Sequence, residues 1–508
     1  MKERDSKTIS LWQNVDETDQ LTPTINTAGI TYDVLIVGGG ISGLTTALRL
    51  QTAGKKCILA EARSIGFGTT GGTTAHLNTV YDTPYLDIEK DFGEEAAKLM
   101  ALAAMESLSH IKNNIDQYGI DCDFEVKDAY MYSENKKETQ QLADILAATR
   151  KAGINMVESP DNGVPVPFQL AALIKDQAQF HPLKYLSQLA KAFVDAGGVL
   201  LENTFIRKTS VADGLHTAES DHGNIQALNL VYATHMPPGV NLLDFRCAPY
   251  RSYVLGITLT NADYPDHLVY DMQEPYHYTR CHVIEGQKYL ILGGEDHKTG
   301  HDDPEKAFKA LEDYARKYYY VAEIPYRWSA QYYEPADGLP YIGQLPGADE
   351  HTFIATGFSG NGMIYGTLAA NMITDHILGL ENKYAKLLSP SRMKPVAGFT
   401  EFVKENADVA YRFIADRLKT QDIDSLAELA PGTGMVVKYQ DEKLAIYKDQ
   451  MGKVTALSPV CTHAGCIVNF NQTEGSWDCP CHGGRYDCYG KVITGPPTKD
   501  LAQIQLEE

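Results

Sequence analysis

The sequence lacks a long uninterrupted hydrophobic run. Its longest apolar segment, residues 34–48, is broken by Gly and Ser residues and is shorter than a membrane-spanning helix requires. It is also poor in basic residues, with 45 Lys and Arg against 66 Asp and Glu and a formal net charge of −21. Because nucleic acids and anionic lipid surfaces are bound by basic faces, this balance argues against both as partners. The charged residues 1–10 precede no apolar core, which predicts a cytoplasmic protein without a secretory signal.

Cysteine is scarce over most of the chain. The first 430 residues hold only four of the nine cysteines, which we expect to be small buried side chains: Cys57, Cys122, Cys247 and Cys281. The other five lie between Cys461 and Cys488. A secreted disulfide scaffold would spread its cysteines, whereas a local cluster in a cytosolic chain indicates a metal site.

The length of 508 residues and the hydrophobic content of 44% predict about three domain-sized pieces. Residues 1–31 form a polar arm, and residues 32–385 form a module in which helical and strand-like segments alternate. Residues 386–430 are polar and helix-prone with prolines at both ends, which predicts a connector. Residues 431–508 contain short β-like runs separated by turns, which predicts a small all-β domain.

A nucleotide-binding turn lies near the start of the module. A predicted strand at residues 31–37 leads into Gly38, Gly40 and Gly43, which open a helix, and a second strand ends at Glu61. In such a unit the first Gly permits the turn, the second lets the backbone approach a pyrophosphate, and the third lets the helix pack closely. Glu61 can hold ribose hydroxyls. NAD and FAD share this fingerprint, and a structural glycine turn is the alternative.

Further small-residue segments favour FAD. Residues 66–76 follow Glu61, and residues 337–343 and 355–363 lie far downstream. With the turn they resemble the D-amino acid oxidase/glycine oxidase superfamily of flavoproteins over roughly residues 32–385. The resemblance implies an α/β (α+β) fold, with a Rossmann-type FAD-binding domain interleaved with a substrate domain. It also implies non-covalent FAD, because no Cys lies near residue 330. A second dinucleotide motif for NAD(P)H does not occur.

The same resemblance assigns the FAD contacts. The helix beginning near Gly362 would aim its positive N-terminus at the flavin and stabilise the negative charge of the reduced ring. The strand ending in Thr234 returns to FAD, although His235 stands where the family usually has Gly. The implied contacts are Gly38, Gly40, Ile41, Ser42, Gly43, Glu61, Ala62, Arg63, Thr70, Gly71, Thr74, Ala75, His76, Ile206, Ala233, Thr234, Gly357, Gly360, Asn361, Gly362 and Met363.

Two cysteine- and histidine-containing loops, residues 461–466 and 479–484, lie near the C-terminus. Two Cys and two His would satisfy one zinc ion, so the residue types alone leave zinc open. The loops resemble the Rieske box, in which two Cys hold one iron of a [2Fe–2S] cluster and two His hold the other. The resemblance implies Cys461 and Cys479 on one iron, His463 and His482 on the other, a Cys466–Cys481 disulfide, and a covering proline loop at residues 495–497.

Two further residues bear on the potential of such a cluster. Gly484 stands where Rieske proteins often have a Ser that donates to a bridging sulfide, and Tyr486 stands where a phenol donates to a cysteine sulfur. Losing one donor lowers the potential while the other moderates the effect, so we expect the middle of the Rieske range.

The two halves together resemble bacterial flavoproteins that fuse an FAD oxidoreductase to a Rieske domain. The implied chemistry is oxidation of a small molecule, an amine or amino acid, by hydride transfer to flavin. Electrons would leave singly through the cluster to a one-electron acceptor, a protein or quinone that the sequence does not identify. Two alternatives stay open: an oxygen-using oxidase with a structural or regulatory cluster, and a redox sensor or electron carrier.

Three residues are candidate catalytic groups. Amine-oxidising relatives carry a substrate-binding Arg five residues before the Asp-Gly turn at Asp337, but this chain has Tyr332 there. Arg280, on a predicted substrate-domain strand, is either a substitute cation or an interstrand Arg. His76 follows the second flavin segment and either approaches the flavin ring or packs in the core.

Overall fold

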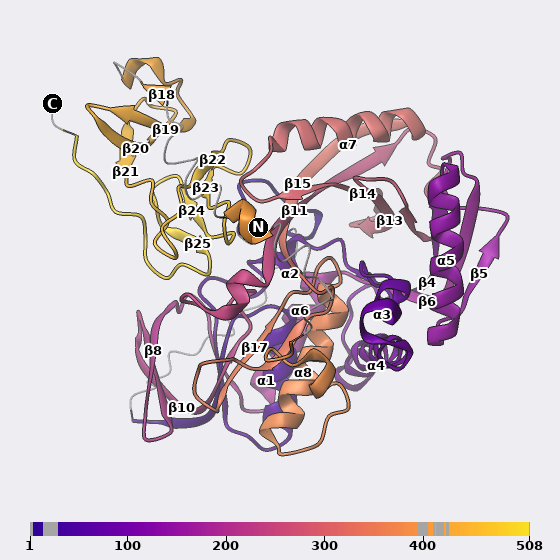
Figure 1. The fold of residues 1–508 in the computed structure, drawn as a ribbon, viewed down its shortest axis with the longest axis horizontal. Coiled ribbons are helices and arrows are strands. Elements are labelled where there is room, and N and C mark those ends of the chain that lie inside the picture. Colours follow the sequence, from indigo (N-terminus) through magenta and orange to yellow (C-terminus); the bar gives the residue numbers. More distant parts are fainter. Residues whose placement is uncertain are drawn as a thin grey trace.

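The computed structural model describes residues 4–13, 29–393, 405–409, 412, 421–422 and 426–506. Figure 1 shows two parts, a large α/β body and a small all-β domain at the upper left that contains the end of the chain. Most of the predicted connector, residues 386–430, and most of the predicted arm, residues 1–31, lie outside the described residues.

A mixed sheet of eight strands forms the base of the body. Its order is β16-β17-β10-β1-β2-β7, with β9 pairing to β10 and β8 to β9. The central strand β1 pairs in parallel with β2 and β10, which explains why β1 and β2 are nearly continuous hydrophobic runs. The strands are β1 (Thr31–Val37), β2 (Cys57–Ala60), β7 (Val199–Leu201), β8 (Ile206–Ala212), β9 (Leu215–Ser220), β10 (Gly223–Tyr232), β16 (Tyr341–Gln344) and β17 (Thr352–Thr356).

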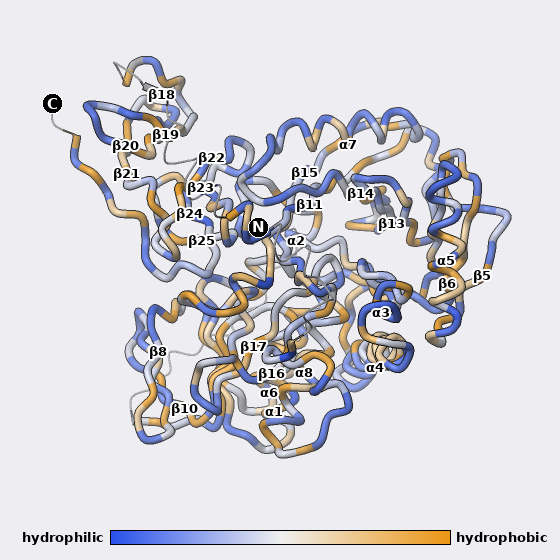
Figure 2. The backbone as a smooth tube through the Cα atoms, viewed as in Figure 1, coloured by the Kyte–Doolittle hydropathy of each residue, from blue (hydrophilic) through white to orange (hydrophobic). Residues whose placement is uncertain are grey.

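Four helices pack together over this sheet. α1 (Ile41–Thr52) contacts α6 (Pro182–Asp195) and α8 (Gly362–Ile377), and α8 also contacts α4 (Glu94–Tyr118). Figure 2 shows hydrophobic segments concentrated around β17, α1 and α6 in the lower half of the view. The other helices are α2 (Thr69–Gly72), α3 (Tyr85–Phe92), α5 (Lys136–Ala152), α7 (Pro304–Tyr318) and α9 (Ala385–Leu388), with 3-10 turns η1 (Leu11–Gln13), η2 (Leu242–Phe245) and η3 (Leu426–Glu428).

A second sheet of nine strands forms the interleaved domain. Its order is β15-β11-β14-β13-β12-β4-β6-β3, with β5 paired to β6, and the parallel pair β12–β4 joins its two halves. The strands are β3 (His76–Leu77), β4 (Glu125–Ser133), β5 (Met156–Ser159), β6 (Leu170–Gln179), β11 (Cys247–Leu259), β12 (Leu268–Asp271), β13 (His277–Ile284), β14 (Gln287–Lys298) and β15 (Val321–Pro335). Because the chain alternates between the two sheets, residues from both sheets can line a single cavity.

The C-terminal domain consists of two antiparallel-rich sheets, as the sequence predicts. The first contains β18 (Gln421–Asp422), β19 (Thr433–Tyr439), β20 (Glu442–Lys448) and β21 (Val454–Leu457). The second contains β22 (Asn469–Asn471), β23 (Ser476–Asp478), β24 (Arg485–Asp487) and β25 (Val492–Thr494). The predicted fold class, a Rossmann-type domain with an interleaved domain and a small all-β domain, is confirmed.

Residues 4–13 of the arm run between the body and the small domain (Figure 1). Ser10 Oγ donates a 2.9 Å hydrogen bond to the carbonyl of Gly71, and Trp12 Nε1 donates one of 2.6 Å to the carbonyl of Thr73. On the other side, Arg485 of β24 donates to the carbonyl of Asp5 at 2.6 Å. The arm therefore touches both the segment expected at the flavin and the small domain.

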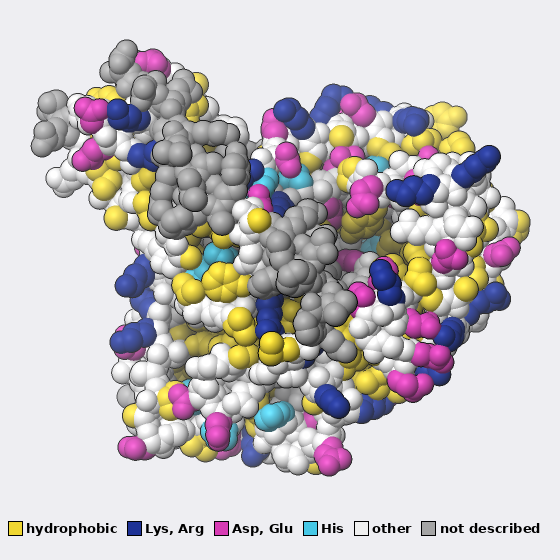
Figure 3. All heavy atoms as spheres, viewed as in Figure 1, with side chains coloured by type: hydrophobic (Ala, Val, Ile, Leu, Met, Phe, Trp, Pro, Cys, Tyr) yellow, Lys and Arg dark blue, Asp and Glu magenta, His cyan; other side chains and the backbone are white. Residues whose placement is uncertain are grey.

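The described surface carries both signs of charge. On the face drawn in Figure 3, acidic and basic side chains are interspersed around the right-hand rim. Ion pairs such as Lys175–Asp128, at 2.6 Å, contribute to this pattern. Within the residues that the structure describes, no helix has the combined length and hydrophobicity to cross a bilayer.

Candidate active site and metal centre

The glycine turn after β1 packs tightly against neighbouring backbone atoms. Gly38 has a φ of +112°, and a Cβ there would lie 2.4 Å from the carbonyl oxygen of Ala233. A Cβ on Gly43 would lie 1.9 Å from the oxygen of Gly38. Only Gly is tolerated at either position, so α1 begins directly against the sheet with its N-terminal amides available to an anion.

A cavity of about 620 Å³ extends from this turn to the second sheet. Most of the expected FAD contacts line it: Gly38, Gly40, Ile41, Ser42, Glu61, Ala62, Thr70, Thr74, His76, Ile206, Ala233, Thr234, Gly360, Asn361, Gly362 and Met363. Among the residues that line it in the described chain, none is Cys.

Five expected contacts lie outside the cavity wall: Gly43, Arg63, Gly71, Ala75 and Gly357. Each is used for packing or for a bond elsewhere. Arg63 donates to the carbonyl of Val492 in the small domain at 2.9 Å. A Cβ on Gly71 would meet the oxygen of Gly66 at 2.2 Å, and one on Gly357 would meet Pro335 at 3.1 Å. These residues pack behind the residues that line the cavity.

Glu61 stands at the end of β2, beside the glycine turn. Its Oε2 accepts a 2.6 Å hydrogen bond from the amide of Gly39, and its Oε1 accepts one of 2.9 Å from the amide of Arg63. Burial raises the pKa of Glu61, and these amides oppose the rise. The carboxyl is thus held beside the glycine turn in the cavity wall, where the resemblance implies the ribose of FAD.

His235 occupies the backbone conformation that a Gly would usually supply. Its φ is +69°, in the left-handed region, and it lines the cavity. Its ring lies edge-on to Tyr333, with 5.0 Å between the ring centroids. Burial lowers the pKa of His235 to about 4, so the imidazole is neutral at physiological pH. The departure from Gly therefore preserves the local path of the chain.

The turn before α8 is fixed by Asp82. Its Oδ2 accepts a 2.6 Å hydrogen bond from the amide of Gly360, while its own amide donates to Asn361 Oδ1 at 2.9 Å. α8 begins at the next residue, Gly362, and its N-terminus faces the cavity. This places a positive helix end where the resemblance puts the flavin ring.

The candidate catalytic residues separate into two groups. Tyr332 and His76 line the cavity, with Tyr332 Oη 2.9 Å from Asp296 Oδ2 and His76 Nδ1 2.9 Å from Tyr270 Oη. Arg280 does not line it. Its guanidinium is fully buried and donates to the carbonyls of Ala75, at 2.7 Å, and Phe180, at 3.3 Å.

Of the two alternatives for Arg280, these contacts favour the interstrand Arg over the substrate-binding cation. Trp12 of the arm covers the guanidinium, with 5.3 Å from its carbon to the ring centroid. Burial lowers the pKa of Arg280 to about 9. Its contacts join β13 to Trp12 of the arm, to Ala75 just before β3 and to Phe180 just after β6.

The four expected metal ligands converge at the tip of the small domain. The rings of His463 and His482 are perpendicular, with 4.9 Å between their centroids, and Nδ1 of each is buried without a hydrogen-bond partner in the described chain. Cys461 and Cys479 are buried, and hydrogen bonding from Cys479 and from Tyr486 lowers the pKa of Cys461 to about 6. Unpartnered imidazole nitrogens and an acidic thiol are suitable metal ligands.

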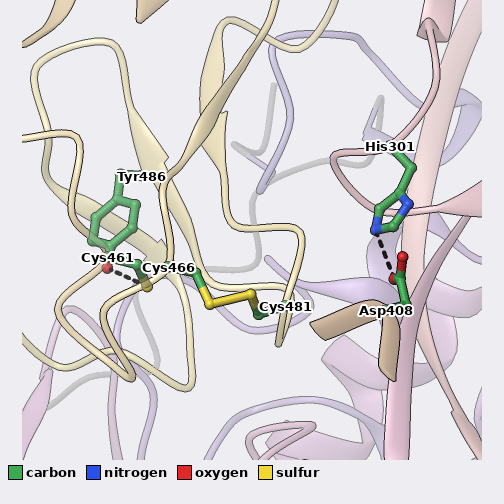
Figure 4. Close-up of a disulfide and its surroundings, with 6 residues drawn as sticks. All are labelled: His301, Asp408, Cys461, Cys466, Cys481 and Tyr486. Atoms are coloured by element: carbon green, nitrogen blue, oxygen red, sulfur yellow. Dashed lines mark hydrogen bonds and ion pairs between the residues drawn. A yellow bond between two sulfur atoms is a disulfide. The ribbon is translucent and has the colours of Figure 1, made fainter. Parts of the chain in front are cut away.

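The predicted disulfide between Cys466 and Cys481 is confirmed (Figure 4). Both residues come from the ligand loops, so the bond joins the two loops and leaves two Cys and two His for a metal centre. Figure 4 also shows Tyr486 beside Cys461, with 3.2 Å between Oη and Sγ. A Cβ on Gly484 would lie 3.7 Å from the same sulfur and 2.8 Å from Pro497 of the proline loop.

The metal loops face the body rather than solvent. Tyr333 donates a 3.0 Å hydrogen bond to the carbonyl of His482, and Gln331 Nε2 donates one of 2.9 Å to the carbonyl of Gly483. His463 Nε2 lies 3.4 Å from Asp244 Oδ2 of η2. Residues 493–498, which include the proline loop, line the 620 Å³ cavity itself. The cavity and the metal centre therefore share a wall.

Two family models match the chain. The model described as FAD dependent oxidoreductase matches residues 33–376, and that described as Rieske [2Fe-2S] domain matches residues 419–505. The chain belongs to the FAD-dependent oxidoreductase family and carries a Rieske domain. Its cofactors are accordingly FAD and a [2Fe–2S] cluster. The residues fit both groups, since the cavity has a phosphate-binding turn and the loops offer two thiols and two unpartnered imidazoles.

Individual relatives agree with this assignment. This oxidoreductase is 33% identical over 478 residues to the putative Rieske 2Fe-2S iron-sulfur protein YhfW of Bacillus subtilis, covering 94% of each chain. It is 25% identical to gamma-glutamylputrescine oxidoreductase of Escherichia coli, covering 77% of this chain and 94% of that one. The fold matches glycine oxidase from Geobacillus kaustophilus with a TM-score of 0.58 and 18% identity, covering 72% of this chain and 99% of that one.

Several cavity residues were not anticipated from the sequence of this oxidoreductase. Asp82, Asp296 and Glu334 all line the cavity but belong to no short motif. They come from the loop before α3, from β14 and from β15, and only the pairing of strands brings the last two together. The one local signal was Tyr332 in place of the family's Arg, because a changed residue at a substrate-binding position indicates changed neighbours.

Proposed function

We propose that this FAD-dependent oxidoreductase is a dehydrogenase that oxidises a small amine or amino acid and passes the electrons to its own Rieske cluster. Bound FAD supplies the two-electron chemistry and the cluster takes one electron at a time. The observation that carries the proposal is the shared wall, in which residues 493–498 of the Rieske domain line the flavin cavity.

Two hydrogen bonds connect the wall of the cavity to the cluster loops. Gln331 lines the cavity and donates to the carbonyl of Gly483, and its strand neighbour Tyr333 donates to the carbonyl of His482. A hydrogen bond to a ligand's own backbone holds that ligand loop against β15. We propose the β15 segment from Gln331 to Tyr333 as the route between the cavity and the cluster.

His76 and Tyr332 are the residues that we propose to act on the substrate. Burial lowers the pKa of His76 well below its usual value, with Arg280 adding to the effect, so its imidazole is neutral. Its Nε2 is buried and has no partner in the described chain, which leaves it available for a hydrogen bond with the substrate. Tyr332 Oη is directed by Asp296 and can position a polar group of the substrate.

The experiment is anaerobic mixing of the FAD-loaded protein with a panel of amines, amino acids and hydroxy acids. We expect bleaching of the flavin band by members of the amine or amino acid classes. Tyr332→Phe should slow this bleaching, whereas Tyr384→Phe should not, because it removes a hydroxyl bound to Glu106 and neither residue lines the cavity. Bleaching by hydroxy acids alone would contradict the proposed substrate class.

A further inference from the structure

The substrate end of the cavity is acidic. Asp82, Asp296 and Glu334 line it, and no Lys or Arg is found among the lining residues within the described part of the chain. The position at which relatives carry an Arg is Tyr332, and Arg280 is occupied by backbone carbonyls. An amino acid carboxylate entering this site would therefore find no cation to pair with, and it would oppose the ionisation of Asp296 and Glu334.

Asp296 offers an unfilled acceptor. Its Oδ2 accepts the hydrogen bond from Tyr332, and the hydroxyls of Ser252 and Tyr276 also interact favourably with the carboxyl group. Its Oδ1 is buried and forms no hydrogen bond of normal geometry in the described chain. The same Tyr332 hydroxyl lies 3.4 Å from Glu334 Oε1. A buried acceptor without a donor costs free energy, and a ligand that brings N–H groups or positive charge removes that cost.

Aromatic rings surround these carboxylates. Tyr270, Tyr276, Tyr278 and Tyr332 all line the cavity. The rings of Tyr276 and Tyr278 are 5.5 Å apart, and Tyr332 stacks on Tyr250 with 5.9 Å between centroids. The faces of tyrosine rings attract ammonium groups, most strongly where water is excluded. Carboxylates and aromatic faces together form a recognition site for organic cations.

From this arrangement we propose that the substrate is a cationic amine without a carboxylate beside the reacting nitrogen, held by Asp296 and Glu334 between the tyrosine rings. The inference rests on the proposed function and narrows its substrate to the amine class. Pairing of the ammonium with Asp296 positions the amine, and the carboxylate can take up the proton that the ammonium must lose before oxidation.

The charge state of the carboxylates supports this arrangement. Burial, with the charge of Asp82 adding to it, raises the pKa of Asp296 to about 7. Burial and the charges of Asp82 and Asp296 raise the pKa of Glu334 to about 8. The titratable groups that face Asp296 are Tyr332 and Glu334 on β15, Tyr276 and Tyr278 around β13, and Asp82, and none is a cation. A bound cation would favour ionisation, so cation binding should tighten as pH rises through this range.

The test is binding of benzyltrimethylammonium, a permanent cation that does not titrate, to the full-length FAD-loaded protein, followed by calorimetry and by the flavin spectrum. Benzoate and benzyl alcohol serve as the anionic and neutral probes of the same ring. We expect the cation to bind about tenfold or more tightly than either, with affinity that rises from about pH 6 to about pH 9. Benzoate binding as tightly as the cation would overturn the inference, as would no binding of the cation.

Two variants test whether the cation binds in the acidic pocket. Asp296→Asn should weaken the cation about tenfold or more. Asp313→Asn, which removes an exposed carboxylate of α7 that pairs with Lys309, should leave it unchanged. If Asp296→Asn fails to retain FAD, Glu334→Gln provides the same test. An unchanged affinity for the cation in either variant, in protein that is folded and retains FAD, would overturn the inference. Because binding requires no turnover, this result is independent of whether the cluster accepts electrons.

Discussion

The hydroxyl of Tyr333 donates a 3.0 Å hydrogen bond to the backbone carbonyl oxygen of His482. Tyr333 is the neighbour of Tyr332, whose hydroxyl lies 2.9 Å from Asp296 in the cavity. Because successive side chains of a strand point to opposite faces, two adjacent residues of β15 contact the substrate pocket and the cluster loop respectively. This short stretch of backbone connects the two halves of the proposed reaction.

Removing that hydrogen bond should slow electron transfer to the cluster without slowing substrate oxidation. In Tyr333→Phe the cluster loop loses one of its two described contacts to β15, so we expect reduction of the cluster to slow several-fold. Anaerobic stopped-flow measurement follows the flavin and cluster absorbance separately. Tyr384→Phe is the matched control. Equal slowing of both phases would show a general structural defect instead.

His482→Cys should convert the cluster spectrum toward that of an all-thiolate ferredoxin and lower its potential, because thiolate is a stronger donor than imidazole. This position suits the test, since both ring nitrogens of His482 are buried and lack a partner in the part of the chain described. Absorption and electron paramagnetic resonance spectra provide the readout. An unchanged spectrum in protein that retains iron would show that His482 is not a ligand.

Gly484→Ser should raise the cluster potential relative to Gly484→Ala. Both variants place a Cβ 2.8 Å from Pro497, so both displace the proline loop, and they differ only in the hydroxyl. A hydroxyl there can donate to the sulfur atoms of the centre and stabilise the more negative reduced state. A redox titration of both variants measures the difference, and equal potentials would argue against this donor position.

Asp296→Asn should stabilise the folded protein at neutral pH. The pKa of Asp296 rises on folding from an ordinary carboxyl value to about 7, so the folded state holds a proton that the unfolded state releases. Stability of the parent protein therefore falls as pH rises through this interval, and Asn removes that loss. The melting temperatures of the two proteins should diverge between about pH 4 and about pH 7, from the ordinary carboxyl pKa to the raised one, and keep a constant difference above that. Parallel curves would contradict the raised pKa.

The parts of the site that lie in short segments could be predicted from the sequence. Gly is required at positions 38 and 43 because neighbouring backbone atoms approach closely there, and such a requirement is visible in the sequence as a short glycine motif. The Rieske loops likewise hold their ligands within six residues each, so their resemblance to the Rieske box implies both the two-loop centre and the disulfide, and the structure confirms the disulfide.

The acidic pocket could not be predicted, because sheet pairing assembles it. Asp296 and Tyr332 are 36 residues apart and meet only through β11, which pairs with both β14 and β15. The surroundings of Arg280 could not be predicted for a related reason. It lies two residues beyond Tyr278 on β13, where Trp12 of the arm covers it, and no local pattern shows that the arm returns to this strand.

We propose that electrons from the substrate leave through the Rieske cluster. The most direct test is a single anaerobic turnover of the full-length protein with an amine that bleaches its flavin, sampled by rapid freezing for electron paramagnetic resonance. We expect the signal of the reduced cluster to rise as the flavin band is bleached. A bleached flavin with a cluster that stays oxidised would contradict electron transfer to the cluster.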